Sequence, residues 1–94
     1  MKSIEEFINK LNKNIKCETL NINILNKKIN EYEAIIDVIQ YNEYSTNTIR
    51  QYREKINQCY LKIESSFENI NYNRNLLATM KKIDKIIKRG EKSA

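Results

Sequence analysis

Apolar residues recur every three or four positions over the first forty residues of the chain. The series runs through Ile4, Ile8, Leu11, Ile15, Ile22, Leu25, Ile29, Tyr32, Ile36 and Ile39. Steps of three and four in alternation are typical of the apolar seam of a coiled-coil helix. The pattern predicts a first helix over about residues 3–40, with a polar interruption of the seam at Glu18.

The second half of the chain resumes the pattern after a short polar interval. Residues 41–47 contain Asn, Ser and Thr and do not continue the seam, which indicates a turn. A second helix is predicted over about residues 48–89, ended by a left-handed cap at Gly90, with a frayed tail over 90–94. Its seam runs through Ile49, Tyr52, Ile56, Cys59 or Tyr60, Ile63, Phe67, Ile70, Leu77, Met80, Ile83 and Ile87.

An Asn-rich stretch, FENINYNRNLL at residues 67–77, raises the question whether this second helix is continuous or locally broken. A turn centred near residue 46 would bring together residues whose numbers sum to about 92. Glu18 then faces Arg74, with Asn73 beside it. We therefore predict a continuous helix and a structural polar layer in which the carboxylate and guanidinium pair. The alternative is that the heptads drift here and both charged groups reach solvent.

The same register places Leu25 opposite Phe67 and Tyr32 opposite Tyr60, so that apolar residues meet along both helices. The chain has no Pro and a single Gly, as long helices require. The predicted fold is a single all-α domain over residues 1–94, an antiparallel two-helix coiled-coil hairpin.

Apolar side chains outside the two seams predict a binding partner. Cys17, Leu20 and Ile24 share a face of the first helix that is turned away from the second. A lone hairpin would leave this apolar face exposed to solvent, so we expect a homodimer or another helical protein to complete a four-helix bundle. Three tyrosines near the turn are further candidate partner-binding residues; they are Tyr41, Tyr44 and Tyr52. The alternative is that they pack between the two helices and stabilise the turn end of the hairpin.

Positive charge is concentrated in the second half of the chain. The 17 Lys and Arg residues exceed the 12 Asp and Glu residues, giving a net charge of +5. Residues 1–48 carry six basic and seven acidic side chains, and residues 49–94 carry eleven and five. A basic face near the C-terminus can attract nucleic acid, an anionic membrane or an acidic protein. A Lys-rich helix face that only contacts solvent would have the same sequence pattern. Its residues are Lys81, Lys82, Lys85, Lys88 and Arg89.

The sequence offers few residues suited to catalysis or metal binding. The chain has no His and no Gly-rich phosphate loop, and its Cys17 and Cys59 form no CxxC pair. We expect no catalytic residues, no metal and no cofactor, and two free thiols. No apolar run suggests a signal peptide or a membrane span, which predicts a soluble cytoplasmic protein with leaderless export left open.

The length, the mid-chain turn and the sequence Tyr44-Ser45-Thr46 before Ile49 and Tyr52 resemble the WXG family of helical hairpins exported by type VII secretion systems. Tyr44 stands at the family's Trp and Thr46 at its Gly, so both signature residues are absent. Residues 60–64 match the family's aromatic-x-x-x-acid export pattern in residue type, but lie in the middle of the second helix. The resemblance implies a non-enzymatic secretion partner or substrate that binds another helical chain.

A different class of function is also compatible with the composition, which is rich in Ile, Asn and Lys. A small phage or mobile-element inhibitor of a host defence or nucleic-acid machine, similar in kind to an anti-CRISPR protein, would use the basic C-terminal helix. A secretion partner would bind through Leu20 and Ile24, whereas an inhibitor would bind through the basic residues near the C-terminus.

Overall fold

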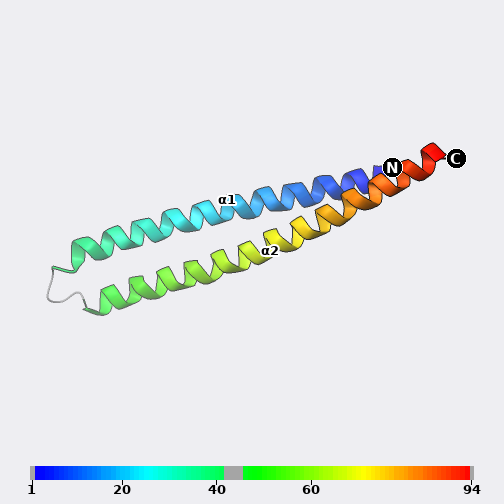
Figure 1. The fold of residues 1–94 in the computed structure, drawn as a ribbon. Coiled ribbons are helices and arrows are strands. Elements are labelled where there is room, and N and C mark those ends of the chain that lie inside the picture. Colours follow the sequence, from blue (N-terminus) through cyan, green and yellow to red (C-terminus); the bar gives the residue numbers. More distant parts are fainter. Residues whose placement is uncertain (1, 42–45, 94) are drawn as a thin grey trace. The chain divides into compact units, whose positions relative to one another are not determined.

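The computed structural model describes residues 2–41 and 46–93, which form two long helices (Figure 1). Helix α1 spans Lys2–Ile39 and helix α2 spans Thr46–Ser93. After α1, the amide of Gln40 still donates to the carbonyl of Ile36 at 2.9 Å. No strand occurs within these two described ranges. The predicted fold class, an all-α antiparallel two-helix hairpin, is confirmed.

Helix α2 is continuous through the Asn-rich stretch, as predicted. Two polar side chains in this region bond to the carbonyl one turn earlier. The Asn73 amide Nδ2 donates to the carbonyl of Asn69 at 2.6 Å, and the Thr79 hydroxyl donates to that of Asn75 at 3.1 Å. Side chains bonded in this way do not compete with the helix by forming turns. Of the four asparagines in the stretch, Asn73 is bonded in this way, and the seam residues Ile70 and Leu77 on either side of it are buried and half-buried.

The predicted end of α2 at Gly90 is wrong, because the helix continues to Ser93. Gly90 has no positive φ and so forms no left-handed cap. A glycine within a helix costs only about 1 kcal/mol relative to alanine, which is too little to end a helix by itself.

The chain divides into two compact units, and each helix contributes to both. The first unit, called the terminal unit below, comprises Met1–Thr19 and Phe67–Ala94. The second, called the turn unit, comprises Leu20–Ser66. Within each unit, a segment of α1 packs against a segment of α2 that runs in the opposite direction.

The buried side chains follow one strict seam on each helix. On α1 they are Ile4, Leu11, Ile22, Leu25 and Ile29, and on α2 they are Ile56, Cys59, Ile63, Ser66 and Ile70. The spacing on α2 alternates between three and four residues without a break, as in a coiled coil. This alternation leads from Ile63 to Ser66 and then to Ile70. Phe67, which the sequence analysis placed in the seam, is 53% exposed.

The register of the two helices also differs from the prediction. In the terminal unit, Asn14 donates a hydrogen bond to Asn73 at 3.4 Å. In the turn unit, Asn21 donates to Ser66 at 3.3 Å. The residue numbers of both pairs sum to 87 (14 with 73, and 21 with 66) instead of about 92. The shift arises because α1 ends at Ile39 and α2 begins at Thr46, so the turn is centred before residue 46.

The predicted pairing of Glu18 with Arg74 is wrong for the same reason. Glu18 is half-buried on the seam of α1, whereas Arg74 is exposed on α2. Neither takes part in an ion pair with any described residue. Asn73 is half-buried and accepts the hydrogen bond from Asn14, so the polar layer of the terminal unit joins two neutral amides.

Candidate interaction surface

The side of α1 that faces away from α2 carries apolar side chains in the turn unit. Leu20 is 53% exposed and Ile24 is 56% exposed. Ile22, between them in the sequence, is buried, because residues two apart on a helix point to nearly opposite sides. Cys17 is also exposed, as the sequence analysis expected for this face. Exposed apolar residues that lie together on one helix face are typical of an interaction site.

This face continues beyond the residues found from the sequence. Val38 is 76% exposed and Ala34 is exposed, and they lie fourteen residues, or four turns, after Ile24 and Leu20. The exposed residues Lys27 and Glu31 occupy the positions between the two apolar ends. We call the part of this face that α1 contributes to the turn unit the outward stripe of α1; it comprises Leu20, Ile24, Lys27, Glu31, Ala34 and Val38. The missed residues lie seven and fourteen positions after Leu20 and Ile24, so the sequence could have revealed them through this heptad spacing.

The corresponding side of α2 in the turn unit is mostly polar. The positions two residues after those of the buried seam are Gln51, Glu54, Gln58, Leu61 and Ser65, and all five are exposed. Leu61 is the apolar member of this set and is 66% exposed. The outward apolar surface of the turn unit is therefore concentrated on α1.

The tyrosines predicted to cluster at the turn do not share one role. Tyr52 is half-buried and packs on Tyr32, with ring centroids 5.7 Å apart. The ammonium group of Lys55 lies 5.0 Å from the Tyr52 ring centroid and 5.8 Å from that of Tyr32, within cation–π range. Tyr41 is exposed, and Tyr44 lies outside the described residues. Tyr52 thus belongs to the packing between the helices, and Tyr41 remains available to a partner.

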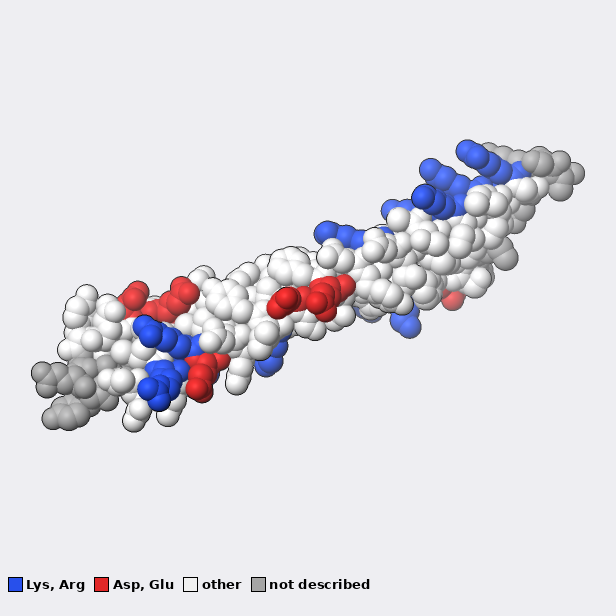
Figure 2. All heavy atoms as spheres, turned by 60° about the horizontal axis from the view of Figure 1, so that its bottom comes forward, with Lys and Arg blue, Asp and Glu red and all other residues white. Residues whose placement is uncertain are grey.

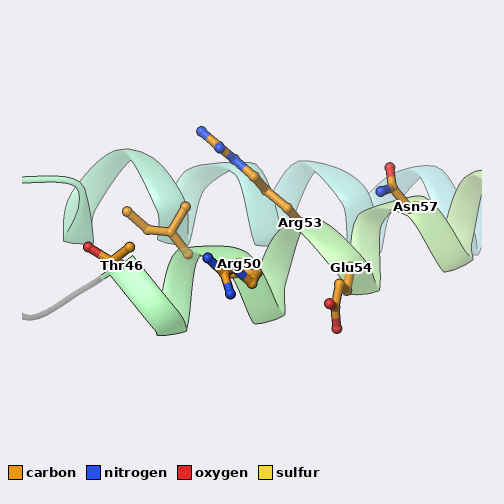
Figure 3. A pocket seen from close by; sticks show the side chains of 6 residues that line it. Thr46, Arg50, Arg53, Glu54 and Asn57 are labelled. Carbon is orange, nitrogen blue, oxygen red and sulfur yellow. The ribbon is translucent and has the colours of Figure 1, made fainter.

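A shallow groove of about 450 Å³ lies along the first turns of α2 (Figure 3). Its lining residues are Thr46, Ile49, Arg50, Arg53, Glu54 and Asn57. Figure 3 shows Arg53 and Glu54 extending to opposite sides of the helix, so the two charges do not converge on one point. In the part of the chain that the structure describes, no three His, Cys, Asp or Glu side chains come together as a metal site would require.

The net charge of the protein lies entirely in the terminal unit. That unit contains eleven Lys or Arg and six Asp or Glu, whereas the turn unit contains six of each. Figure 2 shows basic side chains gathered over the last turns of α2. Lys81, Lys82 and Lys85 are exposed there, as are Lys88 and Arg89. Lys88 forms an ion pair with Asp84 at 3.0 Å, one turn earlier on the same helix.

Both cysteines are free, with Cys17 exposed and Cys59 buried in the seam of α2. Neither described helix has an apolar stretch of the length that a membrane crossing demands. Comparison with protein-family models, with curated proteins and with solved structures finds no match to this chain.

Proposed function

We propose that the protein is a non-enzymatic interaction module whose outward stripe on α1 packs against a helix of another protein chain. The observation that carries this proposal is the exposure of Leu20 and Ile24 on the side of α1 opposite to its buried seam. Helices that are apolar on two sides are stable in water when both sides are covered. A helical partner fits the stripe because its spacing is that of a helix packing seam.

Two biological settings are proposed for this module. The WXG resemblance supports a role as a type VII secretion partner or substrate, in which the outward stripe of α1 would hold the other helical chain. A phage or mobile-element inhibitor of a host machine is the alternative, in which the basic end of α2 would contribute to binding. Tyr41 is exposed at the end of α1 and could extend the contact in either setting.

Replacing Leu20 by Asp should abolish capture of the helical partner. The carboxylate would have to be buried without a counter-ion among the apolar side chains of the proposed contact, which weakens binding by at least about tenfold. The measurement is affinity capture from a lysate of the source organism, with and without nuclease, followed by quantification of the captured protein.

Leu61→Asp is the matched control, because Leu61 is equally apolar and more exposed but lies on the outward side of α2. It should capture the partner as the wild type does. Equal losses for both variants, or no loss for Leu20→Asp, would refute the assignment of the surface to α1.

Binding of an anionic polymer is a second candidate function. It is supported by the distribution of charge, since the terminal unit carries the whole net charge of +5 and the turn unit is neutral. A basic surface releases counter-ions from a polyanion on binding, and such binding weakens steeply as salt is raised. The candidate residues are Lys81, Lys82, Lys85, Lys88 and Arg89.

The double substitution Lys81→Glu and Lys85→Glu should weaken binding to a DNA oligonucleotide and make it less dependent on salt. Each lost phosphate contact reduces the slope of log affinity against log salt by about one. Arg50→Glu with Lys62→Glu changes the same charge in the neutral turn unit and should have a much smaller effect. If the two double variants bind DNA equally well, the basic end of α2 has no specific role.

A further inference from the structure

The outward stripe of α1 is symmetric about its own midpoint. Leu20 and Val38 lie at equal distances from residue 29, as do Ile24 and Ala34. Lys27 and Glu31 flank the midpoint at equal distances and carry opposite charges. The steps along the stripe alternate between four and three residues. This is the spacing of a coiled-coil seam, and it lies on the side of α1 opposite to the buried seam.

We propose that the occupant of this stripe is a second copy of the same chain, with its α1 running antiparallel about a two-fold axis near residue 29. This inference rests on the proposed function and names its partner. In the dimer, Leu20 packs against Val38 of the second copy, and Ile24 packs against Ala34 of the second copy. The two-fold axis repeats each contact, as in any isologous interface.

Charge complementarity supports a second copy over an unrelated partner. The symmetric arrangement places Lys27 opposite Glu31 of the second copy, and it does so twice. Both side chains are exposed, and neither forms an ion pair with another described residue of its own chain. The turn unit has six basic and six acidic residues, so two such units approach without net repulsion. Any stripe of alternating three- and four-residue steps has symmetric spacing, so it is the mirrored order of apolar and charged side chains that favours a second copy.

The stripe spans several turns of α1. It extends over nineteen residues, from Leu20 to Val38, inside the uninterrupted helix α1. At 1.5 Å per residue this is about 28 Å, or roughly five helical turns. Apolar side chains occupy both ends of this length and the charged pair occupies its centre, so that a shifted register would oppose charged to apolar side chains.

Charge reversal provides a test that does not depend on folding differences between variants. Lys27→Glu should weaken the dimer by about tenfold or more, because the introduced carboxylate would face Glu31 of the second copy on both sides of the axis. Glu31→Lys should weaken it similarly, because two lysines would face each other. An equimolar mixture of the two single variants should restore association, since every facing pair in the mixed dimer is again opposite in charge.

Association is measured by sedimentation velocity over a range of protein concentrations, with helicity checked by circular dichroism. Recovery in the mixture supports the proposal, whereas a mixture no more associated than the separate variants overturns it. A wild type that stays monomeric at every concentration also overturns it. If such a monomer still captures another helical protein and loses it on Leu20→Asp, the proposed function survives without the dimer. If Leu20→Asp changes neither measurement, both proposals fail.

Discussion

Replacing Leu25 by Ala is expected to lower the free energy of unfolding by about 3 kcal/mol. Leu25 is buried in the seam of the turn unit, near the level of Ile22 and Ile29 on the same helix. The substitution removes apolar side-chain volume and leaves a cavity that a pair of long helices can fill only in part. Because small domains have a total stability of only about 5–15 kcal/mol, this loss should be large. Urea unfolding followed by circular dichroism provides the measurement.

The matched control is Leu61→Ala, which makes the same chemical change on the exposed side of α2. Both substitutions replace Leu by Ala within a helix, so the difference in helix propensity is the same and cancels. Leu61→Ala should change stability by no more than about 0.5 kcal/mol. Equal destabilisation by both substitutions would show that the inward and outward faces have been assigned incorrectly.

Replacing Glu18 by Leu should raise the free energy of unfolding by about 1–2 kcal/mol. Glu18 is half-buried at a seam position of α1 and has no ion pair among the described residues. Leu at this position adds apolar surface to the seam and removes a charge that gains little from its surroundings. Arg74→Ala should be nearly neutral, because Arg74 is exposed and has no such pair either among the residues described. Thermal and urea unfolding of both variants measure these effects.

A pairing of the two charges would give the opposite result. If Glu18 were the buried partner of Arg74, Glu18→Leu would cost about 3 kcal/mol by leaving the guanidinium unpaired. A double-mutant cycle on these two residues would then show a coupling energy, whereas the observed geometry predicts additive changes. A loss of stability of that size would contradict the register described above.

The fold class and the outward position of Leu20 and Ile24 follow from the sequence, because helical periodicity is a geometric property of the chain. Two apolar residues on the side opposite a seam must be exposed in a two-helix hairpin. The continuity of α2 was predicted correctly, but from a pairing of Glu18 with Arg74 that does not occur among the described residues.

The register could not be obtained in this way, because the most apolar residue near a seam position need not be the one that is buried. At residues 66 and 67 the structure buries Ser66 and exposes Phe67. Ser66 is small and satisfies its hydroxyl with the Asn21 amide, so the strict alternation of steps is kept at little cost. The strict alternation of steps on α2 leads to Ser66, but a search for apolar residues selects the larger Phe67 one position later.

Helix α1 has a buried seam and an exposed apolar face on opposite sides of the same segment. Its inward seam, with Ile22, Leu25 and Ile29, forms the core of the turn unit. Its outward stripe is proposed to bind a second copy, while the net positive charge of the chain lies in the terminal unit. Because the two faces are separate, substitutions in the outward stripe are expected to weaken the proposed binding without unfolding the hairpin.

Sedimentation equilibrium of the wild type, Leu20→Asp and Leu61→Asp tests this account most directly. The wild type and Leu61→Asp should shift from the mass of one chain to that of two as concentration rises. Leu20→Asp should keep the mass of one chain over the same range, with unchanged helicity. The same mass for all three proteins at every concentration would contradict self-association through the outward stripe of α1.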